Sequence, residues 1–149
     1  MRDDIIIRQA AISDCPRFCQ LNRDALGYDY PYEKTLVRLR LILSRPSDKI
    51  YVAECEGIVA GYVHAADYEC TYCGPLKNIM AIAVDERLRG LGIGKKLLLA
   101  AQGWAKECGC EGVRLSSGFA RTQAHEFYQH CGYTLRKEHK NFVKIFDGI

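Results

Sequence analysis

The residues best suited to chemistry lie in one glycine-rich stretch, Arg-Leu-Arg-Gly-Leu-Gly-Ile-Gly-Lys-Lys at positions 87–96. An apolar run at residues 78–84 comes before this stretch. Apolar residues also recur after its start at helical spacing, at Ile93, Leu97, Ala101, Trp104 and Cys108. The pattern predicts a strand, a tight glycine loop and a helix, in that order. Glycines in such a loop let a ligand approach the backbone closely.

The predicted helix begins with features of an anion site. The first turn of a helix has backbone N–H groups without partners, and the helix dipole places partial positive charge there. Lys95 and Lys96 would be repelled by that charge, and a phosphate lying over the turn removes the conflict. We therefore predict phosphate binding. The alternative is an ordinary glycine turn with solvated lysines.

Spacing excludes the two common nucleotide-binding loops. A Walker loop needs four residues between its first glycine and the Gly-Lys pair, followed by Ser or Thr. Gly90 and Gly94 have three residues between them, and Lys96 occupies the Ser/Thr position. The dinucleotide fingerprint Gly-x-Gly-x-x-Gly also fails, because Lys95 stands where its last glycine is needed.

Two motifs give the chain a specific resemblance. The glycine loop resembles the acetyl-CoA loop of the GNAT superfamily of N-acetyltransferases, whose motif Arg/Gln-x-x-Gly-x-Gly/Ala is matched by Arg89, Gly92 and Gly94. A second family motif, Ala-x-x-Phe-Tyr followed by Gly-Tyr or Gly-Phe, is matched by Ala124, Phe127, Tyr128, Gly132 and Tyr133. The motifs stand in the family's order and spacing, and the resemblance covers nearly the whole chain.

The resemblance implies that acetyl-CoA is the co-substrate, and it implies where acetyl-CoA binds. The pantetheine arm would lie along the backbone of Ile82, Ala83 and Val84, where the fourth and fifth strands separate. One N–H group there would polarise the thioester carbonyl, as an oxyanion hole does. The pyrophosphate would lie on amides of the loop, which comprises Arg89, Gly90, Leu91, Gly92, Ile93, Gly94 and Lys95. The alternative for Ile82 and Val84 is a core role, which uses their side chains and is compatible with the first.

The same resemblance assigns the catalytic acid. Tyr128 matches the family tyrosine that protonates the departing thiolate. The alternative is that Tyr128 only packs, because it shares a helix face with Ala124 and Phe127. Arg121 stands seven residues before the tyrosine, where many family members have an asparagine that contacts the cofactor. We predict that Arg121 contacts a phosphate or an acidic part of the substrate, and the alternative is a solvated charge at the helix start.

No motif identifies the catalytic base. An amine like that of lysine, with a pKa near ~10.4, is mostly protonated at neutral pH, so a proton must be removed before attack. Asp67 is our choice for the base, directly or through water. A solvated surface carboxylate is the alternative. His64 belongs to the same predicted strand but faces the other side, because the two positions differ by an odd number.

The acceptor site is expected beside a tyrosine-rich loop. Residues of this loop, which borders the acceptor groove in the family, are Tyr28, Asp29, Tyr30 and Tyr32. Asp29 would attract a cationic amine. The alternative is that the loop packs against the partner of a homodimer, and we expect the protein to be a homodimer.

Length, charge and the distribution of apolar residues limit the domain number, the partners and the cellular location that we expect. A chain of 149 residues suits one domain, residues 1–149. The net charge of +3 is mild, so the sequence gives no case for nucleic-acid binding. No apolar run approaches the ~20 residues of a membrane span, and the N-terminus has no features of a signal peptide. We therefore expect a cytoplasmic protein whose eight cysteines are reduced thiols.

Four of these cysteines form two close pairs, Cys70-x-x-Cys73 and Cys108-x-Cys110. In the family fold, the turns that carry them lie at the same sheet edge, so the four thiols would be able to meet. The spacing does not match two Cys-x-x-Cys halves, so we predict no metal site. A zinc site is the alternative.

The order of elements predicts a GNAT-like α/β fold, mixed in its α+β character. Strands are expected at residues 5–9, 50–55, 58–67, 78–84, 113–117, 133–136 and 141–146. Helices are expected at residues 13–26, 32–44, from 93 to about 108, and around 124–131. The result is a mixed, mostly antiparallel sheet of six to seven strands, with a central parallel strand–helix–strand crossover and helices on both faces.

The function expected from these features is N-acetyl transfer. An acetyl group would pass from acetyl-CoA to a primary amine of a small molecule or peptide, by direct attack in a ternary complex. The alternative is an acyl-CoA-binding sensor without turnover. A thiol or zinc module using the cysteine pairs is a third hypothesis.

Overall fold

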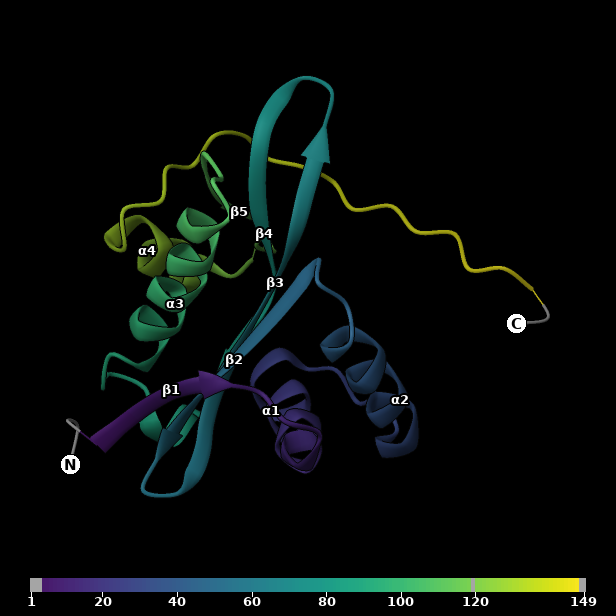
Figure 1. Cartoon of the computed structure of the whole chain (residues 1–149), viewed down its shortest axis with the longest axis vertical. Coiled ribbons are helices and arrows are strands. Elements are labelled where there is room, and N and C mark those ends of the chain that lie inside the picture. Colours follow the sequence, from purple (N-terminus) through teal and green to yellow (C-terminus); the bar gives the residue numbers. More distant parts are fainter. Residues whose placement is uncertain (1–3, 119, 148–149) are drawn as a thin grey trace. The chain divides into compact units, whose positions relative to one another are not determined.

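A mixed sheet of five strands organises the first part of the chain (Figure 1). The computed structural model describes residues 4–118 and 120–147. The strands lie side by side in chain order: β1 (Ile5–Gln9), β2 (Asp48–Cys55), β3 (Ile58–Cys70), β4 (Cys73–Val84) and β5 (Gly112–Leu115). Neighbouring strands from β1 to β4 are antiparallel, whereas β5 runs parallel to β4.

The sheet confirms the predicted class and corrects two of its details. The mixed, mostly antiparallel arrangement is confirmed, as is the parallel pair joined through a helix. The parallel pair is at one edge of the five strands, however, and not at the centre. The prediction of six to seven strands is not confirmed for the described residues.

The missing strands were expected near the C-terminus. The described residues at 133–136 and 141–146 form no strand, although we predicted an antiparallel pair there. Their apolar side chains are largely exposed, as at Leu135, Phe142, Val143, Ile145 and Phe146. Alternation of apolar residues shows that a segment can pair, but pairing also needs a partner with matching register.

The helices begin and end close to the predicted boundaries. They are α1 (Cys15–Leu26), α2 (Tyr32–Leu43), α3 (Ile93–Glu107) and α4 (Thr122–His130), with the short 3₁₀ helices η2 (Ile12–Asp14) and η3 (Glu86–Leu88). The chain forms two compact units, Met1–Leu115 and Ser116–Ile149. The sheet and helices α1 to α3 belong to the first unit, and α4 belongs to the second.

Helices cover both faces of the sheet in the first unit, as predicted (Figure 1). On one face, α1 and α2 pack on a core that includes Phe18, Leu39 and Tyr62. On the other face, α3 buries an apolar stripe of Ile93, Leu97, Leu98, Ala101, Trp104 and Ala105. The stripe follows the helical spacing that the sequence shows.

The turn between β3 and β4 is shorter than expected. We predicted strands at residues 58–67 and 78–84, but the strands continue until only Thr71 and Tyr72 remain between them. Cys70 pairs with Cys73 at the end of the hairpin. The Gly and Pro residues that suggested a longer turn lie within β4.

An ion pair joins β1 to the start of α1. Arg8 donates to both carboxylate oxygens of Asp14, with Nη1–Oδ2 at 2.9 Å and Nη2–Oδ1 at 2.8 Å. The backbone N–H of Ala11 also donates to Oδ2, at 2.8 Å. The hydrogen bond from Arg8 lowers the pKa of Asp14, although burial opposes the shift. The carboxylate is therefore strongly favoured in the folded state.

We expect this pair to make stability depend on pH. A pKa that is lower in the folded state gives stability that is present above the unfolded pKa, near ~3.9, and is lost as pH falls through the folded value. Asp14→Asn should reduce the free energy of unfolding by about 2 kcal/mol at pH 7. The gap between the variant and the parent should narrow below about pH 4. Urea unfolding at several pH values measures both effects.

Asp24→Asn is the matched control, because Asp24 forms an exposed pair with Arg23. It should change stability little at any of these pH values. A gap for Asp14→Asn that stays constant down to pH 2 would contradict the role given to its charge.

Candidate active site

The glycine loop has the predicted order of strand, loop and helix. β4 ends at Val84, and α3 begins at Ile93 with Gly92 as its N-cap. Gly90 and Gly92 have positive φ values of 85° and 82°, in the left-handed region that side-chain-bearing residues rarely adopt. The glycines are therefore required by the path of the backbone at these two turns.

The loop also has the properties that a diphosphate needs. A Cβ atom at Gly90 or Gly92 would meet no atom within 4 Å, so the space over both residues is open. The N–H of Lys96 donates to the carbonyl of Gly92 at 3.1 Å, which starts the helical hydrogen bonds. The N–H groups of the preceding residues, Ile93, Gly94 and Lys95, therefore have no acceptor within the helix. Acetyl-CoA would place its pyrophosphate on these donors.

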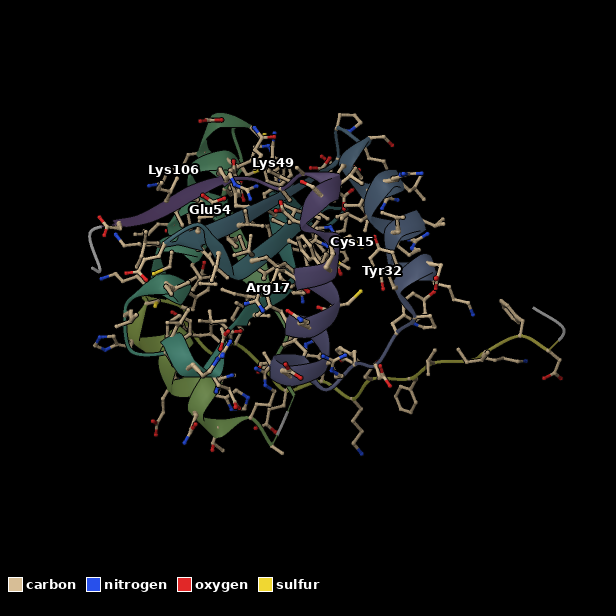
Figure 2. The ribbon with its side chains drawn as sticks, turned by 90° about the horizontal axis from the view of Figure 1, so that it is seen from below. Cys15, Arg17, Tyr32, Lys49, Glu54 and Lys106 are labelled. Atoms are coloured by element: carbon tan, nitrogen blue, oxygen red, sulfur yellow. The ribbon has the colours of Figure 1, made fainter. Side chains whose placement is uncertain are left out.

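The start of the loop is fixed by Asp85, a residue that the sequence reasoning missed. Its carboxylate accepts from the backbone N–H of Arg87 at 3.0 Å and from Arg87 Nη2 at 2.9 Å. Arg17 of α1, labelled in Figure 2, donates to Asp85 at 3.3 Å and to the carbonyl of Val59 at 2.8 Å. These bonds, with the Arg87 side chain foremost, hold the pKa of Asp85 well below its usual range, although burial opposes the shift.

A cavity of about 500 Å³ lies between α1 and this loop. It is lined by Arg17, Gln20, Leu21, Asp24, Ala25, Asp85, Glu86 and Arg87. Its walls carry charges of both signs, and two of the arginines are already engaged with Asp85.

The edge of β4 next to the loop is open for part of its length. The pairing of β4 with β5 runs from Leu76–Gly112 to Ile79–Leu115 and then stops. β4 continues to Val84, and no strand among the described residues pairs with this end on the β5 side. Backbone groups along that edge are therefore available to an extended ligand.

A bulge marks the point where the pairing ends. Ile79 pairs with Ala65 of β3 and Ala81 pairs with His64, so Met80 is an extra residue without a partner in β3. A bulge bends its strand and increases the local twist. The bulge thus coincides with the end of the β4–β5 pairing at Ile79.

The residues assigned to the pantetheine arm lie on this open stretch. Ala83 is buried in the core beneath α1, whereas Ile82 and Val84 are half-buried. The core role was expected as an alternative for Ile82 and Val84, but the fully buried side chain is that of Ala83 between them. Burial of side chains here leaves the backbone of the strand edge accessible, because side chains and the strand edge point in different directions.

Tyr128 lies on α4 in the second unit. It is buried among aromatic rings, with Phe127 at 5.4 Å and Tyr133 at 6.2 Å between ring centroids. Burial raises the pKa of Tyr128, which the charge of Arg121 partly offsets. The phenol therefore stays protonated at neutral pH, as a proton donor must.

Two other residues near α4 have clear positions. Arg121 occupies the N-cap position of α4 and is exposed. His125 makes a 2.8 Å hydrogen bond between Nε2 and the carbonyl of Gly118. This bond gives His125 a structural partner within its own unit.

Asp67 lies on β3, toward the hairpin end and away from the unpaired end of β4. It forms an ion pair with Lys77, with Nζ–Oδ1 at 2.5 Å. The register pairs Asp67 with Lys77, five positions before Ile82, which corresponds to about 17 Å along a strand. The structure therefore brings Asp67 to a buried lysine and not to the residues predicted for the thioester.

Lys77 is a charged residue that sequence reasoning missed. It is only 5% exposed, and its ammonium lies 3.9 Å from the centroid of the Trp104 ring. Burial works to lower the pKa of Lys77, but the hydrogen bond and charge of Asp67 outweigh burial and raise it. Asp67 thus acts as the counter-ion of this lysine.

His64 points to the opposite face, as the alternation predicted. Its Nε2 lies 2.7 Å from Oδ2 of Asp48 on β2. Both side chains are largely buried. His64 is thereby directed toward β2, away from the open edge of β4.

The tyrosine-rich loop between α1 and α2 is another feature that the sequence analysis singled out. Tyr28, Tyr30 and Tyr32 are exposed in and beside the loop between α1 and α2.

The turns that carry the two cysteine pairs lie side by side, because the N–H of Glu111 donates to the carbonyl of Pro75 at 2.8 Å. Within residues 4–118 and 120–147, no three His, Cys, Asp or Glu side chains are arranged to hold a metal ion. No helix of the described chain is long and apolar enough to cross a membrane.

Comparisons with known proteins agree with this geometry. The chain is 27% identical over 132 residues to an aminoglycoside N(6')-acetyltransferase type 1 of Stenotrophomonas maltophilia, covering 85% of this chain and 84% of that protein. It is 30% identical over 135 residues to an N-alpha-acetyltransferase of Sulfurisphaera tokodaii, covering 85% and 78%. The fold matches that of the aminoglycoside N-acetyltransferase AAC(6')-Iy in complex with CoA, with a TM-score of 0.84 at 20% identity and 94% of each chain covered.

The profile of one family covers most of the chain. The acetyltransferase (GNAT) family profile matches residues 15–133, which include both the glycine loop and the motif around Tyr128. The chain therefore belongs to the acetyltransferase (GNAT) family, whose co-substrate is acetyl-CoA.

Proposed function

We propose that this protein transfers an acetyl group from acetyl-CoA to a primary amine of a small molecule or peptide, by direct attack in a ternary complex. The observation that carries the proposal is the open helix start at Gly92 next to the unpaired end of β4. The amides at the helix start suit a diphosphate, and the unpaired edge of β4 suits the extended pantetheine arm. The two units would act together as one domain.

Each part of the loop has a separate role in holding the co-substrate. The amides of residues 89–95 bind the pyrophosphate, and Lys95 and Lys96 add positive charge beside it. The backbone of Ile82, Ala83 and Val84 hydrogen-bonds the pantetheine arm, and one of its N–H groups polarises the carbonyl. Arg121 supplies a further cation for a phosphate. The thioester of acetyl-CoA provides the acetyl group and a thiolate leaving group.

Proton transfer divides between two groups. Tyr128 donates a proton to the departing thiolate, and its raised pKa keeps that proton available. The base that deprotonates the amine stays a prediction for Asp67, working through water. The ion pair with Lys77 favours a structural role for Asp67 instead.

The acceptor is proposed from the relatives and from one loop. Relatives include an aminoglycoside acetyltransferase and an N-alpha-acetyltransferase, and both of these classes act on amines. Asp29, among exposed tyrosines between α1 and α2, would attract a cationic acceptor. The competing use of this loop is the interface of a homodimer, which sedimentation of the purified protein would show.

Loss of the glycine conformation should weaken co-substrate binding. In Gly92→Val, a β-branched residue would have to adopt a φ of 82° at the helix start, and its side chain would enter the open space over the loop. We expect the Kd for CoA, measured by calorimetry, to rise at least about tenfold. Gly103→Ala, within α3 and also in open space, is the control and should leave the Kd unchanged.

An unchanged Kd for Gly92→Val would exclude the loop as the pyrophosphate site. Circular dichroism of both variants separates this result from a loss of folding.

Removal of the Tyr128 hydroxyl should slow turnover without weakening CoA binding. Tyr128→Phe keeps the ring that packs beside Phe127 and Tyr133 but removes the proton donor. We expect kcat to fall by about 10²-fold, with the Kd for CoA within about twofold of the parent value. Release of free CoA with a panel of amines measures the rate.

Tyr133→Phe is the matched control and should retain most activity. If Tyr128→Phe and the parent are equally active, Tyr128 has only a packing role. If the parent itself releases no CoA with any amine but binds acetyl-CoA, the protein is the sensor named as our alternative.

Substitution of Asp67 distinguishes its two roles. As the counter-ion of buried Lys77, Asp67→Asn should lower the free energy of unfolding by roughly 1–3 kcal/mol and leave kcat within about threefold. Glu69→Gln, on the same strand and exposed, is the control and should change neither. A fall in kcat of about 100-fold with stability unchanged would identify Asp67 as the base.

A further inference from the structure

The tip of the β3–β4 hairpin places two thiols together. Cys70 ends β3 and Cys73 begins β4, and the two are register partners across the turn Thr71–Tyr72. Their sulfur atoms lie 3.0 Å apart but are not joined in a disulfide. Figure 1 shows this tip, in teal, projecting beyond the rest of the sheet.

The backbone already has the separation that a disulfide requires. Directly opposed residues of an antiparallel pair have Cα atoms about 4.5–5.5 Å apart. Disulfides span Cα separations of about 4.4–6.8 Å. Bond formation between Cys70 and Cys73 therefore needs side-chain rotation and little movement of the strands.

The pair is also reactive and accessible. The hydrogen bond from the Cys73 thiol, followed by that from the backbone N–H of Tyr72, lowers the pKa of Cys70. The thiolate is the form of cysteine that attacks a disulfide. Cys73 is exposed, and Tyr72 beside it is 81% exposed, so a small reagent can reach the turn.

Cys15 differs from the hairpin pair in burial and in the direction of its pKa shift. Cys15, the first residue of α1, is buried, and burial raises the pKa of its thiol to about 11. Such a thiol is protonated at neutral pH and screened from solvent. Cys15 should therefore react with a disulfide reagent much more slowly than the hairpin pair.

We propose that Cys70 and Cys73 form a thiol–disulfide exchange site for small disulfides of the glutathione class. The Cys70 thiolate attacks one sulfur of the reagent, which forms a mixed disulfide and releases one small thiolate. Cys73, once deprotonated, attacks Cys70 Sγ, which forms the Cys70–Cys73 bond and releases the second small thiolate. Two protein thiols are oxidised and one small disulfide is reduced to two thiols, so atoms and electrons balance.

The test uses the full-length reduced protein and glutathione disulfide. Samples taken over time are blocked with an alkylating reagent and mapped by peptide mass spectrometry. We expect the Cys70–Cys73 disulfide to form first, before any modification of Cys15 or Cys131. The mixed disulfide should stay at least about tenfold lower in the parent than in Cys73→Ser, because the second step is intramolecular.

Three variants make the outcome decisive. Cys73→Ser should trap glutathione on Cys70, Cys70→Ser should abolish the hairpin disulfide, and Cys110→Ser, in the other cysteine pair, should leave it unchanged. Equal modification of all exposed cysteines, or a Cys73–Cys110 bond in place of Cys70–Cys73, would overturn the proposal. The readout is independent of acetyl transfer, so failure of the proposed function would not affect it.

Discussion

The structure depends on one constraint in β4, which has two neighbouring strands for part of its length and one for the rest. Parallel pairing with β5 ends at Ile79, while antiparallel pairing with β3 continues to Val84. A parallel partner needs a crossover, and α3 provides it. Because α3 begins shortly after β4 ends, its unpaired amides lie next to the unpaired strand edge. The two features that suit acetyl-CoA thus follow from one change in pairing.

Charged side chains hold this arrangement in place from the side of α1. Asp85, at the end of β4, is bonded to Arg17 of α1 and to Arg87 of the loop. One turn earlier, Asp14, just before α1, is bonded to Arg8 of β1. The helix is therefore tied to the sheet at two places by arginine–carboxylate pairs, which are stronger than neutral hydrogen bonds. These pairs keep the loop in a fixed position relative to the strand that precedes it.

The sequence was sufficient for features that depend on local pattern. The glycine loop follows from the need for positive φ at Gly90 and Gly92, and the α3 stripe follows from helical spacing. Features that depend on partners distant in sequence were not predictable in the same way. The ion pair between Asp67 and Lys77 requires the β3–β4 register, and the role of Asp85 requires Arg17 of α1. The two expected C-terminal strands failed for the same reason, because their alternation says nothing about a partner.

The bulge at Met80 also changes which face of the sheet the following residues of β4 occupy. Ile79 shares the α3 face with its partner Ala65, whereas Ala81 and Ala83 lie on the α1 face. Without the bulge, residues 79 and 81 would face the same side. Because Met80 is the additional residue, its deletion would leave Ile79 and Ala81 as neighbours on opposite faces, whereas deletion of a paired residue of β4 would exchange the faces of the side chains beyond it. β4 therefore supplies side chains to both cores, and the bulge keeps its two halves in register with β3.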